Sequence, residues 1–302
     1  MPRPLPPTPY KRSVFTDEVS QELDRAIAVA TDYGLEGLDV RSVWGKTVHE
    51  LDDDELARLR RAADAAGLAI PSVAPPFMKC EVDDPDEWAE HKRILDRSLR
   101  AAERLGARVV RGFTFWRRVG VSHHWPRIVE AYREVAPTIE RSGLVVGIEN
   151  EAACMLGTTE LLPRLLDEVG SPAVRALWDP ANGAVDGELP YPEAFERVAP
   201  YMVHVHLKDG RHVRGRWEHA VVGHGEVGVV DVCRALAARG YGGWVALETH
   251  YRPTRTEADL RSPRGAAFSE LGEEGTRACL DGWRDALEQA AAGSGAAARP
   301  PG

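Results

Sequence analysis

Four residues that can bind a metal ion each lie at the end of an apolar run in the second half of the chain. They are Glu149, Asp179, His206 and Glu248. An ionised carboxylate in apolar surroundings is costly unless a positive charge pairs with it, and a divalent cation supplies that charge well. One acid at such a position is more often a helix cap or a salt-bridge partner. Four potential ligands at the ends of successive apolar runs favour a shared metal site.

The elements that would position these residues are short β-strands that alternate with helical patterns. We expect strands at residues 13–16, 37–40, 68–73, 107–110, 144–148, 174–178, 202–207 and 244–247. Such alternation predicts a parallel sheet with crossover helices. A closed barrel and an open doubly wound sheet both fit, but eight units without a break into halves favour a single (β/α)8 TIM barrel of the α/β class. The carboxyl ends of its strands meet at one face, where catalytic side chains lie.

The length of 302 residues fits one large barrel with additional terminal segments. We expect an N-terminal extension at 1–12, a TIM-barrel catalytic domain at 13–290 and a disordered tail at 291–302. The tail begins with small residues and continues with alanine, arginine and proline. Residues 251–275 form a long polar insertion after the eighth strand, which fits an active-site lid and a surface decoration equally.

Composition and charge exclude several classes of protein. The net charge of −9 counts against general nucleic-acid binding, because an acidic surface repels phosphate backbones. The four cysteines have no C-x-x-C spacing, which counts against a cysteine zinc site and suits a reducing compartment. The chain has no run of about 20 apolar residues and no signal-peptide pattern at its start. We therefore expect a cytoplasmic protein that binds neither membranes nor nucleic acid.

Five short motifs carry a resemblance to a known family. They read GIEN at 147–150, WDPAN at 178–182, HVHLKD at 204–209, GHGE at 223–226, and GYGG at 240–243 leading into Glu248. With these motifs the chain resembles the xylose-isomerase-like TIM-barrel superfamily, and within it the sugar phosphate isomerase/epimerase family, over roughly residues 13–289. The superfamily includes sugar isomerases, sugar epimerases, inosose dehydratases and endonuclease IV.

The resemblance implies a ligand set for one divalent metal ion. In similar proteins the ligands match Glu149, Asp179, His206 and Glu248. We expect only one of His204 and His206 to face the barrel interior, and the resemblance selects His206. Three carboxylates and one imidazole suit Mn²⁺ or Mg²⁺, although Co²⁺ or Zn²⁺ could also bind.

The chemistry that such a site implies is proton removal from a carbon next to a carbonyl. A metal ion would polarise the substrate oxygens, and Glu149 and Glu248 resemble the pair of carboxylates that takes and returns the proton through an enediolate. This predicts a metal-dependent sugar isomerase or epimerase acting on a small carbohydrate-like substrate. Candidate substrate-binding residues are Lys208, His219, Asn182, Arg41, Arg111 and Trp116.

Each candidate substrate contact also has a structural interpretation. Lys208 could form a local salt bridge, Arg41 or Arg111 could neutralise Asp17 or Glu151, and Trp116 could pack in the core. His219 could be a solvated loop residue. Similar proteins often form dimers or tetramers, so a homo-oligomer is left open.

Two other enzyme classes use the same barrel. A lyase or dehydratase acting on a keto-sugar, a keto-inositol or a 3-keto-glycoside would use the same metal site but expel a leaving group. An endonuclease IV-like repair enzyme needs extra histidines, whereas the third and fourth strands here end in Ala74 and Arg111, and Asn182 stands where that family has a histidine. The stretch 223–228 matches G-x-G-x-x-G, but it lies far from a first βαβ turn, so we expect no NAD.

Overall fold

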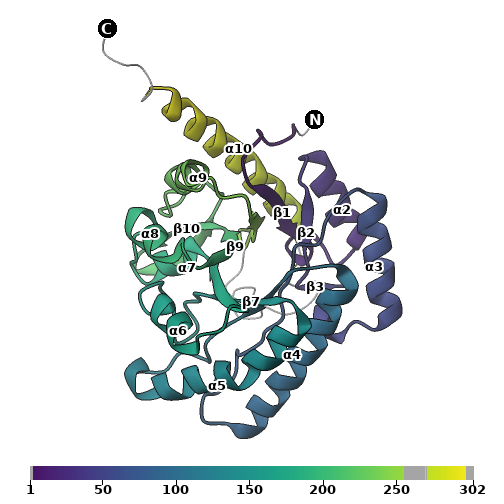
Figure 1. Ribbon diagram of the computed structural model, residues 1–302. Coiled ribbons are helices and arrows are strands. Elements are labelled where there is room, and N and C mark those ends of the chain that lie inside the picture. The colour runs from purple at the N-terminus through teal and green to yellow at the C-terminus, as the bar shows by residue number, and fades with distance from the viewer. Residues whose placement is uncertain (1–2, 255–268, 270, 297–302) are drawn as a thin grey trace.

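The computed structural model describes residues 3–254, 269 and 271–296, and it confirms the predicted (β/α)8 TIM barrel. Eight parallel strands pair in the order β2-β1-β12-β9-β8-β7-β6-β5, and single bridges between Gly37 and Ala69 and between Val40 and Val73 join the two ends. The strands are β1 (Lys11–Phe15), β2 (Gly37–Asp39), β5 (Ser72–Val73), β6 (Val109–Gly112), β7 (Val145–Glu149), β8 (Val174–Trp178), β9 (Met202–Leu207) and β12 (Trp244–Leu247). Figure 1 shows the barrel surrounded by its helices.

Helices cover the outside of the barrel. The main ones are α2 (Leu23–Asp32), α3 (Asp53–Ala65), α4 (Pro85–Leu105), α5 (Val121–Ser142), α6 (Leu162–Val169), α8 (Phe195–Val198), α9 (Val229–Ala238) and α10 (Gly272–Ala296). Helix α4 illustrates how local sequence sets the boundaries. Asp84 caps its start by accepting hydrogen bonds from the backbone N–H groups of Asp86 and Glu87, and Gly106 ends it in a left-handed conformation with φ of 70°.

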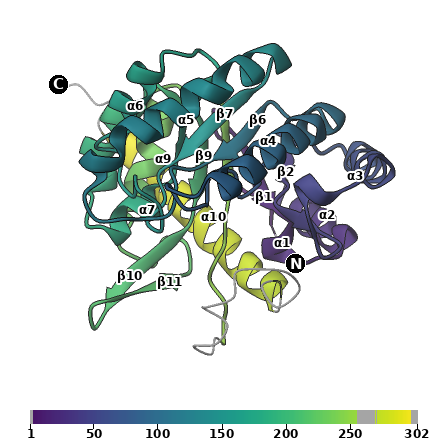
Figure 2. The same cartoon turned by 90° about the horizontal axis from the view of Figure 1, so that it is seen from below.

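Short elements after the strands build the carboxyl-terminal face, which we call the mouth. They are α1 (Thr16–Val19), β3 (Ser42–Val43), β4 (Lys46–Thr47), the 3-10 helix η1 (Val48–Glu50), α7 (Pro180–Val185) and the π-helical turn η2 (Pro190–Ala194). An antiparallel hairpin of β10 (Asp209–Val213) and β11 (Arg216–Ala220) follows β9 directly. Figure 2 shows this hairpin projecting from the body of the protein. The sequence pattern predicted only a polar loop there.

The interior of the barrel contains a polar layer as well as apolar side chains. Asp39 accepts a hydrogen bond from Ser13 Oγ at 2.6 Å and another from Ser72 Oγ, and its Oδ2 lies 2.8 Å from His204 Nε2. All four side chains are fully buried. The expectation that only one of His204 and His206 faces inward was wrong. Residues i and i+2 of a strand share a face, and their two rings lie 5.5 Å apart at their centroids.

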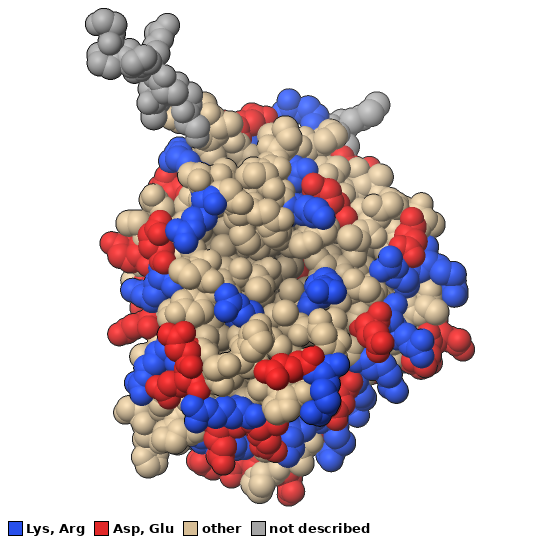
Figure 3. Space-filling model, in the orientation of Figure 1, with Lys and Arg blue, Asp and Glu red and all other residues tan. Residues whose placement is uncertain are grey.

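Helix α10 extends to Ala296, so it enters the segment expected to be a disordered tail, and residues 297–302 lie outside the described residues. Most of the polar insertion at 251–275 is also outside them. Within the described ranges, no helix combines the length and the apolar content needed to cross a membrane. On the face seen in Figure 3, positive and negative side chains alternate around the edge, and the centre is mostly uncharged.

Candidate metal centre

The four predicted ligands come together at the mouth of the barrel. Their ligand atoms, one from each side chain, all lie within 4.8 Å of one another, and all four residues are buried: Glu149, Asp179, His206 and Glu248. His206 Nδ1 lies 3.0 Å from Glu149 Oε1 and 3.9 Å from Glu248 Oε2. Each residue comes from a different strand end of the barrel. The predicted convergence is therefore present in the fold.

Two sets of hydrogen bonds hold Asp179 in place. Its Oδ1 accepts hydrogen bonds from the backbone N–H groups of Ala181 and Asn182, which caps helix α7. The side chain of Asn150 accepts a hydrogen bond from the Asp179 N–H at 2.9 Å and donates one to the Asp179 carbonyl at 2.8 Å. These contacts fix both the backbone and Oδ1, so Oδ2 is the carboxylate oxygen that they leave for another partner.

Three positively charged side chains contact the ligand set. Lys208 Nζ lies 2.7 Å from Asp179 Oδ2 and 2.8 Å from Glu248 Oε2. Arg41 Nη1 lies 2.8 Å from Glu248 Oε1, and Arg111 Nη1 lies 3.5 Å from both glutamates. Asp179 Oδ2 accepts no hydrogen bond of regular geometry among the described residues, so its contact with Lys208 is an ion pair.

Burial and charge set the ionisation of the three acids. Burial raises the pKa of Asp179 to about 6. The charges of Glu149 and Glu248 also raise this pKa, whereas the charge of Lys208 lowers it. Burial would also raise the pKa of Glu149, but the charges of His206 and Arg111 hold it below its ordinary value. The pKa of Glu248 lies well below its ordinary value, because Lys208 and His250 outweigh burial. Both glutamates are therefore carboxylates that can accept a proton.

The other predicted substrate contacts lie at different depths. Asn182 is buried and donates to Glu149 Oε1 at 3.3 Å and to the Asn150 carbonyl at 3.0 Å. His219, on β11, packs its ring 4.8 Å from that of His250. Trp116 lies farther out, where its ring is 5.8 Å from Lys79 Nζ.

Arg41 has the structural role that was weighed for it. It pairs with Asp17 at 2.7 Å and with Glu18 at 2.8 Å, in addition to its contact with Glu248. Because Arg41 bridges three carboxylates, it ties the first strand end to the last. Because Arg41 also contacts Glu248, it lies at the edge of the candidate site.

Several residues at the mouth were missed or given little weight by the sequence interpretation. Lys79 pairs with Glu151 at 2.8 Å and lies 4.2 Å from the ring of Phe113. The ring of Phe15 packs against His206 at 4.9 Å and forms part of the floor of the site. The position of Phe15 at the first strand end could have indicated this role. Lys79 follows an irregular loop, so no periodic pattern marked it.

Backbone N–H groups of the glycine-rich stretch 223–228 bind the carboxylate of Asp209. The buried carboxylate of Asp209 accepts hydrogen bonds from the backbone N–H groups of Gly210, Gly223, Gly225 and Val227, at 2.8 to 3.3 Å. A side chain at Gly225 would overlap Asp209 and the carbonyl of Gly210. The G-x-G-x-x-G match is thus explained by loop anchoring at Asp209.

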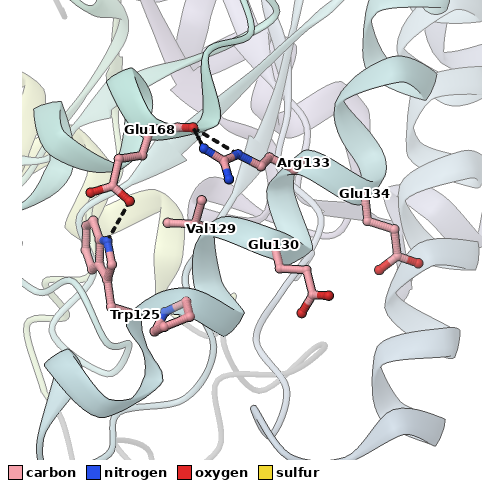
Figure 4. Close-up of a pocket in the computed structure, with 7 residues that line it drawn as sticks. Trp125, Val129, Glu130, Arg133, Glu134 and Glu168 are labelled. Atoms are coloured by element: carbon pink, nitrogen blue, oxygen red, sulfur yellow. Dashed lines mark hydrogen bonds between the residues drawn. The ribbon is translucent and has the colours of Figure 1, made fainter.

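A separate groove of about 500 Å³ opens on the outside of the barrel, between helices α5 and α6 (Figure 4). Trp125 donates a hydrogen bond to Glu168 at 3.0 Å, and Arg133 donates to the backbone carbonyl of Glu168 at 3.0 Å. None of the ligand residues lines it. Trp125 and Arg133 are thus paired with Glu168 of the neighbouring helix, and the mouth remains the candidate site.

The donor set at the mouth fits a divalent cation. Three carboxylates and one imidazole converge from four strands, and oxygen-rich sets of this kind suit hard cations. Nδ1 of His206 faces both Glu149 and Glu248, so it is the ring nitrogen placed to bind an ion between them. These residues would hold the ion without a change in the fold.

Comparison with known proteins agrees with this architecture. A family model described as "Xylose isomerase-like TIM barrel" matches residues 27–291. An uncharacterised protein of Mycobacterium tuberculosis is 29% identical over 264 residues, which covers 79% of this chain and 88% of that protein. The 2-epi-5-epi-valiolone 7-phosphate 2-epimerase of an Actinoplanes species is 29% identical over 263 residues, covering 82% of this chain and 92% of the epimerase.

Solved structures share the fold at low sequence identity. L-ribulose 3-epimerase superimposes with a TM-score of 0.72 at 16% identity, covering 97% of this chain and 99% of the other. D-psicose 3-epimerase from Clostridium cellulolyticum H10 gives a TM-score of 0.71 at 19% identity, with 92% and 99% covered. At these identities the likeness concerns the barrel itself.

Proposed function

Because the chain belongs to the xylose isomerase-like TIM barrel family, we propose that it is a divalent-metal-dependent sugar isomerase or epimerase. The observation that carries the proposal is the convergence of three buried carboxylates and one imidazole at the mouth of the barrel. The relation to a 2-epi-5-epi-valiolone 7-phosphate 2-epimerase and a D-psicose 3-epimerase supports the reaction class. We propose Mn²⁺ or Mg²⁺ as the ion, held by Glu149, Asp179, His206 and Glu248.

The proposed reaction removes a proton from the carbon next to a substrate carbonyl. When bound, the cation would polarise the carbonyl and hydroxyl oxygens and lower the energy of the enediolate. Glu149 or Glu248, as a carboxylate, takes the proton, and the other glutamate, after taking up a proton from solvent, delivers that proton to the opposite face or to the adjacent carbon. The pKa of each group lies below its ordinary value, so either glutamate is ionised at the start and can be the proton acceptor.

Surrounding side chains would orient the substrate. Arg111 lies within 3.5 Å of both glutamates, so its guanidinium would sit beside the reacting carbon. Asn182 donates to Glu149 and would fix which oxygen of that carboxylate faces the substrate. We also propose Lys208, Arg41, His219 and Trp116 as substrate contacts.

The direct test measures exchange of substrate hydrogen with deuterated solvent. Metal-loaded protein is incubated with keto-sugars and keto-inositols, and deuterium incorporation is followed by mass spectrometry. Glu149→Gln and Glu248→Gln should each slow exchange by about 100-fold or more, because each loses its proton acceptor. Glu151→Gln is the matched control, since Glu151 pairs with Lys79 outside the ligand set. Exchange retained in both glutamine variants at saturating Mn²⁺ would contradict the assignment.

A lyase would begin with the same proton abstraction, so product analysis separates the two reactions. An isomerase or epimerase conserves the mass of the substrate, whereas a lyase releases water or a glycosidic partner. Chromatography of the reaction products with mass detection distinguishes these outcomes in a single assay.

A further inference from the structure

Lys208 occupies an unusual position for a substrate-binding residue. It lies two residues after His206, on the same face of the extended chain, and its side chain is buried. Its ammonium group is 2.7 Å from Asp179 Oδ2 and 2.8 Å from Glu248 Oε2. Both oxygens belong to the set that would bind the metal ion, so Lys208 already neutralises two of the ligands.

These two oxygens are also the ones left for a metal ion. Asp179 Oδ1 is engaged by the N–H groups at the start of helix α7, which leaves Oδ2. Glu248 Oε1 is held by Arg41 at 2.8 Å, whereas Oε2 is the oxygen that lies nearer His206. Lys208 and a cation would therefore use the same pair of oxygens.

The balance of charge at the ligand set also indicates that Lys208 and a cation compete. Without a metal ion, the three ligand carboxylates contact three cationic groups, from Lys208, Arg41 and Arg111. A dication placed among the same carboxylates leaves an excess of positive charge, and like charges a few ångströms apart repel. Arg41 is held by Asp17 and Glu18 as well, whereas both contacts of Lys208 are with ligand residues.

We propose that Lys208 is a built-in counter-ion that competes with the divalent cation for Asp179 Oδ2 and Glu248 Oε2. In the metal-free protein it keeps the ligand carboxylates together. When the cation binds, the ammonium group leaves these oxygens and becomes available to a substrate oxygen. The inference rests on the proposed metal-dependent function and explains how a substrate contact could depend on metal loading.

The competing interpretation gives Lys208 the role of a brace that keeps the ligands in place after the cation has bound. The two roles predict opposite changes in metal affinity when Lys208 is replaced. Removing a competitor tightens metal binding, whereas removing a brace loosens it. The affinity for Mn²⁺ alone, measured without any substrate, therefore distinguishes them.

The experiment compares wild-type protein with Lys208→Met, which keeps the length of the side chain and removes its charge. Full-length protein is stripped with a chelator and dialysed, and Mn²⁺ binding is measured by titration calorimetry. We expect Kd to fall at least about 10-fold in Lys208→Met. The melting temperature of the metal-free variant should lie below that of wild type, and its rise on adding Mn²⁺ should be larger.

Lys79→Met is the matched control, because Lys79 also pairs with a glutamate at 2.8 Å at the mouth but contacts no ligand residue through that pair. Its Mn²⁺ affinity should stay within about threefold of wild type. Lys208→Arg retains the charge and should not tighten binding, and Lys208→Gln serves if the methionine variant does not fold.

An unchanged or weaker affinity in the charge-removing variants would overturn the competition while leaving the metal site intact. Wild-type protein that binds no divalent cation under these conditions would overturn the proposed function and the competition together.

Discussion

At the scale of single residues, the side chain of Asn150 is the contact that most directly positions a ligand. It makes two hydrogen bonds to the backbone of Asp179, at 2.9 and 2.8 Å, and it is fully buried. Asn150→Ala would leave the N–H of Asp179 unpaired and its carbonyl with only the 3.4 Å hydrogen bond from the Gly183 N–H, which costs about 1–3 kcal/mol in the free energy of unfolding. Metal affinity should fall by about 10-fold or more, since the ligand loses its support. Denaturant unfolding and Mn²⁺ titration measure the two effects.

The control for this prediction is a buried hydroxyl outside the site. Thr159 is fully buried and donates to Glu188 at 2.7 Å, away from the ligand set. Thr159→Val should lower stability but leave the Mn²⁺ affinity unchanged. Equal loss of affinity in both variants would mean that Asn150 acts through general stability alone.

The sequence indicated the ligand residues more readily than the residues that support them. Glu149 and Asp179 end apolar runs, and a strand end is a position that periodicity can locate. Asn150 follows Glu149 directly, but the direction of its amide depends on how closely β7 and β8 approach. The placement of His204 beside Asp39 likewise joins residues far apart in the chain. Such pairings follow from barrel closure, which no local pattern encodes.

At the scale of elements, the glycine loop that follows β11 is anchored on one carboxylate. Gly225→Ala would push a methyl group into Asp209 Oδ1 and the Gly210 carbonyl, both held by hydrogen bonds. We expect a loss of about 3 kcal/mol or more in the free energy of unfolding, at the upper end of the range for overpacking. Denaturant-induced unfolding followed by circular dichroism measures it.

Gly228→Ala separates steric overlap from backbone strain. Gly228 has φ of 71° but open space around its Cβ position, so the substitution should cost only about 1–2 kcal/mol. If the two alanine variants lose the same stability, the loop is not packed on Asp209 as the contacts indicate.

The eight strands were predictable because each is a short β-branched or apolar run between helical patterns, and all eight predicted strands overlap an observed one. The hairpin β10–β11 was not. Its sequence, from Asp209 to Ala220, carries arginines, histidines and two glycines instead of an alternating apolar pattern, so the segment has the composition of a loop. Its start is fixed by the hydrogen bonds that tie Asp209 to the glycine loop, a contact across 14 to 18 residues.

At the scale of the whole molecule, metal binding should be linked to folding. The four ligands lie between residues 149 and 248 on separate strands, so they meet only when the barrel has closed. A cation that binds the folded state alone stabilises it by about 2.7 kcal/mol at a free concentration 100 times its Kd. Chelator-treated protein should therefore melt several degrees below Mn²⁺-loaded protein, and added Mn²⁺ should restore the difference.

Asp179→Asn tests whether this stabilisation comes from the mouth of the barrel. Asparagine can still cap helix α7 through its side-chain oxygen, so the local fold is retained, but the ligand set loses one negative charge. The Mn²⁺-induced rise in melting temperature should then shrink to a small fraction of the wild-type value. An equal rise in the variant would place the bound ion elsewhere on this acidic protein, and the link between barrel closure and the metal centre would fail. Because the ligands are spread over four strands, the same substitution reports on the site and on the closed barrel that assembles it.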